Sequence, residues 1–254
     1  MTVVETAPGL AAIDTVRHGF FGRQGGVSGD DFAGLNVSLS VGDDAGAVEE
    51  NRRRVRDAID IGPLVLLRQV HSARAEIVTA PLAPGSVEAD ALVTAVPGLA
   101  LGILTADCTP ILLADPVAGI VAAAHAGWRG AVDGVIGNTI AAMRQLGADP
   151  ARIRAAYGPT IHGENYEVGA PFQADFLALH PDGERHFFTP PGGRPHFDLP
   201  GFVEDRLRAA GIAQIETAGL CTYAQPERYF SHRRATHEGS RTGRQIAVIG
   251  LTQL

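Results

Sequence analysis

The sequence contains no lysine, because all 21 of its basic residues are arginine. A Schiff-base lysine, covalent attachment of pyridoxal phosphate and the lysine of a Walker-type phosphate loop are therefore excluded. Any anion that this chain binds must be held by arginine, by backbone N–H groups or by a metal ion.

Cysteines and long apolar segments are also scarce. Two cysteines cannot build a disulfide framework, which indicates a cytoplasmic protein. No apolar run approaches the roughly 20 residues that cross a bilayer. The segment MTVVETAPGLAAIDTVRHGF has no basic region ahead of an apolar core, so it is not expected to be a signal peptide. The net charge of −7 argues against binding to nucleic acid or to an anionic membrane.

What is present is typical of a globular protein. The 254 residues are 45% hydrophobic, with glycine and proline spread throughout, and they can bury a large core. No repeat, low-complexity segment or linker divides the chain, so a single domain over residues 1–254 is expected. Strand-like and helix-like segments are intermixed without strict βαβ alternation, which predicts an α+β fold with mixed sheets.

Apolar periodicity predicts the main elements. Strands are expected at 16–21, 35–44, 64–70, 91–95, 119–126, 152–158 and 244–251. Helices are expected at 45–59 and at about 129–146, and residues 221–243 read as a long polar connection. The helix at 45–59 places Val48, Val55 and Ile59 on one face and arginines on the other, which predicts a solvated outer face.

Three residues that bind metals well lie at the ends of apolar segments. His71 follows the segment 63–70, Cys108 lies in Ala-Asp-Cys-Thr-Pro, and His125 closes the segment 119–126. Imidazole and thiolate donors favour zinc or copper over magnesium or calcium. Three protein ligands would leave a fourth position for water or substrate, as in catalytic zinc sites.

The same residues also allow nucleophilic catalysis, with Cys108 activated by His71 or His125. In either design Asp107 can orient a histidine or carry a proton beside a metal-bound water. A measurement of the bound metal distinguishes the metal site from the cysteine–histidine nucleophile. Cys221 is expected to be a buried structural thiol, with a fourth metal ligand or a disulfide partner as the alternatives.

The motif His-Ala-Gly-Trp-Arg-Gly lies where a predicted strand passes into a predicted helix. The free N–H groups of that helix start, together with Arg129, favour an anion such as phosphate. Trp128 offers either a stacking face or a packing surface.

Motifs along most of the chain resemble one family. They are HGFFGRQGGVS, LNVSLSVGDD, ENR, RQVHSA, TADC followed by TPILLAD, HAGWRG, GPTI with YEVG, FDL, and CTY with FSHRR and TGR. Over roughly residues 15–252 the sequence resembles the laccase-domain family. Members of that family carry the names polyphenol oxidase, purine nucleoside phosphorylase and peptidoglycan editing factor.

The resemblance implies a single domain with layered mixed β-sheets flanked by helices and one zinc ion held by His71, Cys108 and His125. It implies phosphorolysis of adenosine, inosine, guanosine and methylthioadenosine, with adenosine deamination as a second activity. The partners would then be a small nucleoside and phosphate. The catalytic set would be the three ligands with Asp107, and the candidate contacts to substrate or phosphate would be Asn36, Arg52 and Arg129.

One segment departs from the family pattern, since Glu164 and Asn165 stand where the family commonly has cysteines. Other functions also remain open. The chain could be a cytoplasmic hydrolase that edits peptidoglycan precursors, a copper-dependent polyphenol oxidase, or a non-enzymatic protein that stores zinc or uses it structurally. Nine histidines, none in an H-x-H pair, argue against several coppers, and three ligands rather than four argue against structural zinc. A monomer or a weak homo-oligomer is expected.

Overall fold

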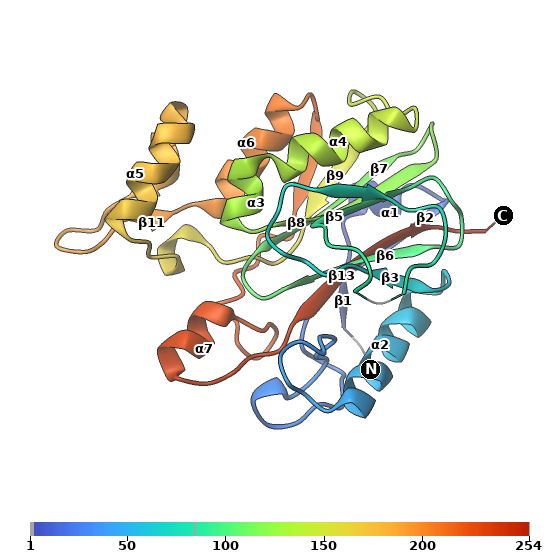
Figure 1. Cartoon of the computed structure of the whole chain (residues 1–254), viewed down its shortest axis with the longest axis horizontal. Helices are drawn as coiled ribbons and strands as arrows, with labels where there is room; N and C mark the ends of the chain where they lie inside the picture. Colours follow the sequence, from blue (N-terminus) through green and yellow to red (C-terminus); the bar gives the residue numbers. More distant parts are fainter. Residues whose placement is uncertain (1–2, 84, 254) are drawn as a thin grey trace.

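The computed structural model describes residues 3–83 and 85–253 and arranges them in layers (Figure 1). In these residues the strands are β1 (Val4–Glu5), β2 (Val16–Phe21), β3 (Leu64–Leu66), β4 (Ala75–Ile77), β5 (Ala91–Thr94), β6 (Ala100–Thr105), β7 (Thr109–Asp115), β8 (Ile120–Ala126), β9 (Arg154–Tyr157), β10 (Phe187–Phe188), β11 (His196–Phe197), β12 (Gln214–Thr217) and β13 (Gln245–Leu251). The α-helices are α1 (Pro8–Ala11), α2 (Ala45–Ile59), α3 (Trp128–Asp133), α4 (Val135–Gln145), α5 (Ala170–Leu179), α6 (Leu199–Ala209) and α7 (His232–Glu238). Short 3-10 helices are η1 (Asp30–Phe32), η2 (Gly163–Asn165) and η3 (Pro181–His186).

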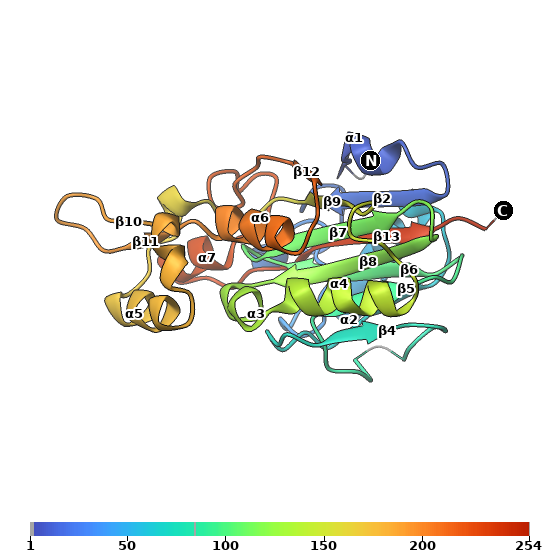
Figure 2. The same ribbon diagram turned by 90° about the horizontal axis from the view of Figure 1, so that it is seen from above.

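The strands form two large sheets and one small one. The five-stranded sheet has the order β1-β2-β13-β6-β3, the six-stranded sheet has the order β12-β9-β7-β8-β5-β4, and β10 pairs with β11. Both large sheets are mixed, because β3 is parallel to β6 and β4 is parallel to β5 while most other pairs are antiparallel. The prediction of an α+β fold with layered mixed sheets flanked by helices is confirmed (Figure 2).

The two large sheets pack face to face. In β8 the side chains of Val121 and Ala123 join the same buried cluster as Leu101 of β6 and Ile249 of β13. The intervening Ala122 belongs to the cluster on the opposite face of the sheet. Strand side chains alternate between faces, so this small-residue strand is buried on both sides and brings the backbones of the two sheets close together.

Helices cover the outer faces of the sheets. α3, α4 and α6 pack on the six-stranded sheet through side chains such as Ile140 and Phe202, while α2 packs on the five-stranded sheet through Val55 and Ile59. Figure 1 shows α4 and α6 above the sheets and α2 below them. In the part of the chain that the structure describes, no helix combines the length and the apolar character needed to cross a membrane.

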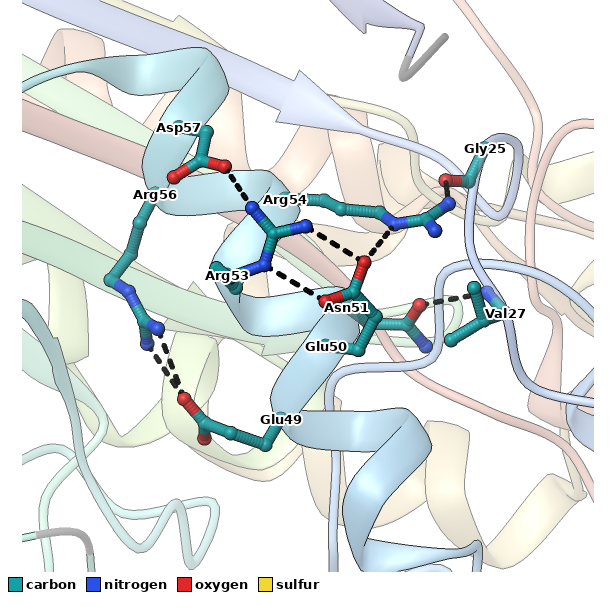
Figure 3. Close-up of polar contacts among 9 residues, drawn as sticks. All are labelled: Gly25, Val27, Glu49, Glu50, Asn51, Arg53, Arg54, Arg56 and Asp57. Carbon is teal, nitrogen blue, oxygen red and sulfur yellow. Dashed lines mark hydrogen bonds and ion pairs between the residues drawn. The ribbon is translucent and has the colours of Figure 1, made fainter.

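Helix α2 has the predicted bounds and the predicted faces. Its outer arginines form ion pairs within the helix, including Arg53 with Glu50 and Asp57 (Figure 3). Its inner face carries a polar residue, because the buried Asn51 side chain accepts a hydrogen bond from the N–H of Val27 at 2.9 Å. The helix therefore holds the glycine-rich loop that precedes it as well as the sheet.

Some predicted elements differ from the structure. Residues 129–146 form two helices rather than one, because Gly134 adopts φ +98° and ends α3 before α4 begins. The predicted strand at 64–70 ends at Leu66. The predicted polar connection at 221–243 contains α7, whose first turn is capped by the Ser231 hydroxyl.

The segment 35–44 is not a strand, although its side chains alternate. The Asn36 side chain accepts from the N–H groups of Ser38 and Arg244 and donates to the Asp43 carboxylate. These side-chain bonds replace the strand pairing that the alternation predicted, and the segment becomes a loop against β13.

Candidate metal centre

Strand register brings Cys108 and His125 together. β7 and β8 are antiparallel, with Thr109 opposite Ala126 and Pro110 opposite His125. Cys108 comes directly before β7 and His125 is near the end of β8. The start of β7 therefore lies beside the end of β8, and the side chains of Cys108 and His125 meet where these two inner strands of the six-stranded sheet end.

His71 reaches the same place from the five-stranded sheet. After β3 the Gln69 side chain forms a pair of hydrogen bonds with the backbone of Leu104, both at 2.8 Å, which continues the pairing beside β6. His71 then adopts φ +58°, a backbone conformation that is uncommon for a residue with a side chain. This turn directs the chain toward Cys108 and His125.

The three ligand atoms of His71, Cys108 and His125 lie within 4.8 Å of one another. Gly127 leaves space for two of these ligands because it has no side chain. A Cβ added there would lie 2.7 Å from Nδ1 of His71 and 3.0 Å from Sγ of Cys108. Two imidazole nitrogens and one sulfur are donors that suit zinc or copper. The residues therefore fit a metal ion with an open fourth position.

A buried carboxylate supports two of these ligands. Asp90 is fully buried and accepts from Nδ1 of His125 at 2.8 Å, which leaves Nε2 as the ligand atom. The same carboxylate accepts from the N–H groups of Val70, His71 and Ser72 and from the Ser72 hydroxyl. One side chain thus fixes the ring of His125 and the backbone of His71.

The electrostatics favour a positive charge at His125 and disfavour one at His71. Burial lowers the pKa of His125, but Cys108 and Asp90 outweigh this effect and raise it to about 9. Partial burial, followed by the charge of His125, lowers the pKa of His71. The surroundings of His125 therefore attract a cation, and a divalent metal ion can occupy the position in place of a proton.

Asp107 lies beside the centre and is tied to other segments. It has φ +87°, and its two carboxylate oxygens accept from the Thr222 hydroxyl and from the N–H of Arg233, each at 2.6 Å. Its backbone carbonyl accepts from the N–H of Ile161. These contacts hold the turn that contains Cys108 next to the start of α7.

The group opens on a cavity of about 570 Å³. Residues that line the cavity include the three ligands, Ser38, Arg52, Gln69, His232 and Arg244. Arg52 was expected from the sequence to contact substrate, and the structure places it in this cavity. His232 begins α7 with an exposed side chain.

Two other predicted contacts lie elsewhere. Asn36 is fully buried and supports the loop behind the cavity through its hydrogen bonds. Arg129 is exposed, and its guanidinium lies 5.0 Å from the centroid of the Trp128 ring. The helix that was predicted to start at about residue 129 begins at Trp128 as α3, which is only six residues long. Cys221 is a free, buried thiol that accepts from the N–H of His162, as its structural role predicted.

Sequence reasoning missed several residues of the site, namely Asp90, Gly127 and Arg244. Asp90 precedes β5, whose first residue Ala91 pairs with Ala124 of β8, so it faces His125 only through sheet register. A single acidic residue before a strand has no local sequence signature. Gly127 and Arg244 lie within motifs of the family resemblance, and that was the only signal available for them.

Comparisons with known proteins identify the family of this chain. The family described as "Multi-copper polyphenol oxidoreductase laccase" matches residues 17–252. A protein of Deinococcus radiodurans named purine nucleoside phosphorylase is 43% identical over 252 residues, which cover 97% of this chain and 95% of the relative. A protein of Streptomyces coelicolor with the same name is 41% identical, covering 91% of this chain and 96% of the relative.

Solved structures show the same fold. Neisseria meningitidis protein NMB0706 aligns with a TM-score of 0.86 and 31% identity over 99% of both chains. YlmD from Geobacillus stearothermophilus aligns with a TM-score of 0.84 and 29% identity over the whole of both chains. Because the family match covers almost the entire chain and the relatives align over nearly their full lengths, this chain belongs to the laccase-like polyphenol oxidoreductase family.

Proposed function

We propose that this chain is a zinc-dependent purine nucleoside phosphorylase. Its substrates would be adenosine, inosine, guanosine and methylthioadenosine, with adenosine deamination as a second activity. The observation that carries the proposal is a His–Cys–His group that opens on a cavity large enough for a nucleoside and lined by arginine. The names of the relatives at about 40% identity support the same reaction class.

Zinc is the proposed metal because the donors are two imidazoles and one thiolate, with copper as the alternative. His71, Cys108 and His125 would hold the ion, and Asp90 would keep His125 in the required tautomer. When bound, zinc supplies a Lewis acid at the floor of the cavity. The chain offers no second cluster of this kind among the described residues, which argues against the several coppers of a multicopper oxidase.

In phosphorolysis the glycosidic bond of the nucleoside breaks as a phosphate oxygen bonds to the sugar, and the products are a free base and ribose 1-phosphate. The protein would have to bind an anion beside the nucleoside and supply a proton to the departing base. Arg52 lies in the cavity and can hold the anion.

For the proton we propose His232 rather than Asp107. His232 lines the cavity, and its ring makes no hydrogen bond within the described residues. Both carboxylate oxygens of Asp107 accept short hydrogen bonds, so that residue is better placed to position the Cys108 turn. Histidine is the side chain that most often transfers a proton to or from a reacting group in enzymes.

The test is to incubate the purified protein with inosine, with and without phosphate and with a chelator, and to measure hypoxanthine by chromatography. Release that depends on phosphate and falls on chelation is expected. Adenosine in the same assay tests the deaminase activity through the formation of inosine.

Cys108→Ala should abolish base release, whereas Cys221→Ala is the matched control because the second thiol lies outside the ligand group. Absence of phosphate-dependent base release by the metal-loaded protein would contradict the proposal. If a muropeptide precursor then loses an amino acid in the presence of the wild type but not of Cys108→Ala, the hydrolase interpretation takes its place.

A further inference from the structure

Two arginines that line the cavity, Arg52 and Arg244, differ from neighbouring arginines in that they form no ion pair with the described residues. On α2, Arg53 and Arg54 each pair with the carboxylate of Glu50. Arg52 and Arg244 are half-buried. Their positive charges are thus partly removed from water without a direct ion pair, although Glu49 acts on Arg52 and Asp107 acts on Arg244 from a distance.

Both arginines contact one residue of the 35–44 loop, Arg52 through its guanidinium and Arg244 through its backbone. The carbonyl of Val37 accepts from Nε of Arg52 at 2.9 Å, and the N–H of Val37 donates to the carbonyl of Arg244 at 3.2 Å. Nη1 of Arg244 donates to the carbonyls of Thr242 and Gly243. These bonds use one edge of each guanidinium and place the two arginines on the same wall of the cavity.

The remaining N–H groups are free to bind a ligand. Within the described residues, neither Nη of Arg52 nor the Nε and Nη2 of Arg244 takes part in a hydrogen bond. Burial lowers the pKa of both guanidinium groups. Arg244 lines the same cavity as His71, Cys108 and His125, so a single small substrate complex can contact both.

The chemistry of this wall selects a small anion with several oxygens. A guanidinium binds phosphate through two parallel hydrogen bonds, and two such groups suit a dianion. The hydroxyls of Ser38 and Ser40 form a hydrogen bond of 2.9 Å with each other in the same cavity, and the O–H not used in it is a neutral donor for a ligand. Arg129, the other candidate, lies over Trp128 and does not line this cavity.

We propose that Arg52 and Arg244 together form the phosphate subsite of this cavity. The ligand is a phosphoryl dianion, carried either by inorganic phosphate or by a sugar phosphate. Its role as a co-substrate rests on the proposed function, but its binding does not.

The test measures binding directly. Inorganic phosphate and, separately, ribose 1-phosphate are titrated by calorimetry into the metal-containing protein as purified. Arg52→Gln and Arg244→Gln should each weaken binding of at least one of the two ligands by about tenfold or more, since each removes a charged bidentate contact. Arg144→Gln is the matched control, because it removes one charge from an exposed position on α4 and should leave binding unchanged.

Arg244→Lys keeps the charge without the bidentate fork and should give an intermediate affinity. Metal content and circular dichroism of each variant show whether the fold and the metal centre persist. If a glutamine variant does not fold, the lysine variant at the same position carries the test.

The outcomes separate this proposal from the preceding one. Arginine-dependent phosphate binding without base release would support the subsite and contradict the phosphorylase. Phosphorolysis with unchanged phosphate affinity and KM in the folded variants would overturn the subsite. Absence of binding of both ligands to the wild type would overturn it as well.

Discussion

The Asp90 carboxylate holds the Nδ1 of His125 at 2.8 Å, and its two oxygens also accept the N–H groups of Val70, His71 and Ser72. A ligand on β8 and a ligand in the loop after β3 therefore depend on one buried side chain. Hydrogen bonding lowers the pKa of Asp90 to about 2, against the opposing effect of burial, so the carboxylate is charged at neutral pH. The carboxylate fixes the geometry of the metal centre before any ion binds.

Asp90→Asn should weaken metal binding by roughly 10- to 100-fold, as loss of such supporting contacts generally does. One carboxylate oxygen of Asp90 would be replaced by the amide NH₂ of asparagine, which cannot accept a hydrogen bond. The N–H of His71 or of Ser72 would then lose its acceptor. Competition with a chromophoric chelator measures the affinity. Asp115→Asn is the control, because Asp115 is equally buried but pairs with Arg152. Equal metal affinities in the two variants would contradict the role given to Asp90.

Gly127→Ala should reduce metal content without a backbone penalty. Gly127 has φ −71° and ψ 165°, which alanine adopts readily, but the new methyl would lie 2.7 Å from His71 Nδ1. Gly137→Ala is the matched control, since nothing lies within 4 Å of its added Cβ and it lies inside α4. That control should keep its metal and gain roughly 0.5–1 kcal/mol of stability. Elemental analysis and urea denaturation distinguish the two, and full metal occupancy in Gly127→Ala would refute the steric argument.

Acid should destabilise the protein through His18, which lies in β2 and is not one of the metal ligands. His18 is buried, accepts from the N–H of Ala7, and has its pKa lowered by burial to about 4 although Glu216 opposes this. The unfolded chain takes up this proton near pH 6.5, whereas the folded chain does so only near pH 4. Stability from this group is therefore complete above pH 6.5 and is lost as the pH falls toward 4, by roughly 3 kcal/mol.

The measurement is urea denaturation of the wild type and His18→Gln between pH 7 and 4. The wild type should lose more stability over this interval than the variant, because glutamine does not titrate. The other histidines are common to both proteins, so the difference between the two curves reports His18. Parallel curves would show that His18 does not carry this dependence.

Removal of the metal should leave the protein folded. The ligands lie at the ends of elements that already pack in the two-sheet core. Within the described residues only three ligands converge, so the ion is not needed to close the fold. We expect chelation to abolish activity and to lower the thermal midpoint by only a few degrees. Circular dichroism before and after chelation measures this, and unfolding on chelation would identify a structural metal instead.

Much of the fold was predictable where a local pattern decides the structure. The 3.6-residue apolar repeat of Val48, Val55 and Ile59 predicted α2 with its correct bounds. The small-residue run at 119–126 predicted a strand, and β8 occupies Ile120–Ala126 with every residue buried. Local patterns failed where distant groups compete for the backbone, as at Val37, whose hydrogen bonds go to Arg52 and Arg244 rather than to a neighbouring strand.

The candidate site divides in the same way. His71, Cys108 and His125 could be proposed together because each stands at the end of an apolar segment within a recognisable motif, and the structure brings them together. Asp90 and Arg244 could not be selected from the many acidic residues and arginines of the chain. Their position depends on the register of β5 against β8 and on the placement of β13, which no single segment encodes.

The central place of β13 also affects how the protein is made. Gln245–Leu251 fills the gap between β2 and β6, yet it leaves the ribosome after every other strand of both large sheets. Until then β2 and β6 each expose an unpaired edge, and the cavity wall lacks Arg244. The five-stranded sheet therefore cannot be completed until Gln245–Leu251 has been synthesised, and until then its two inner edges can pair with other chains.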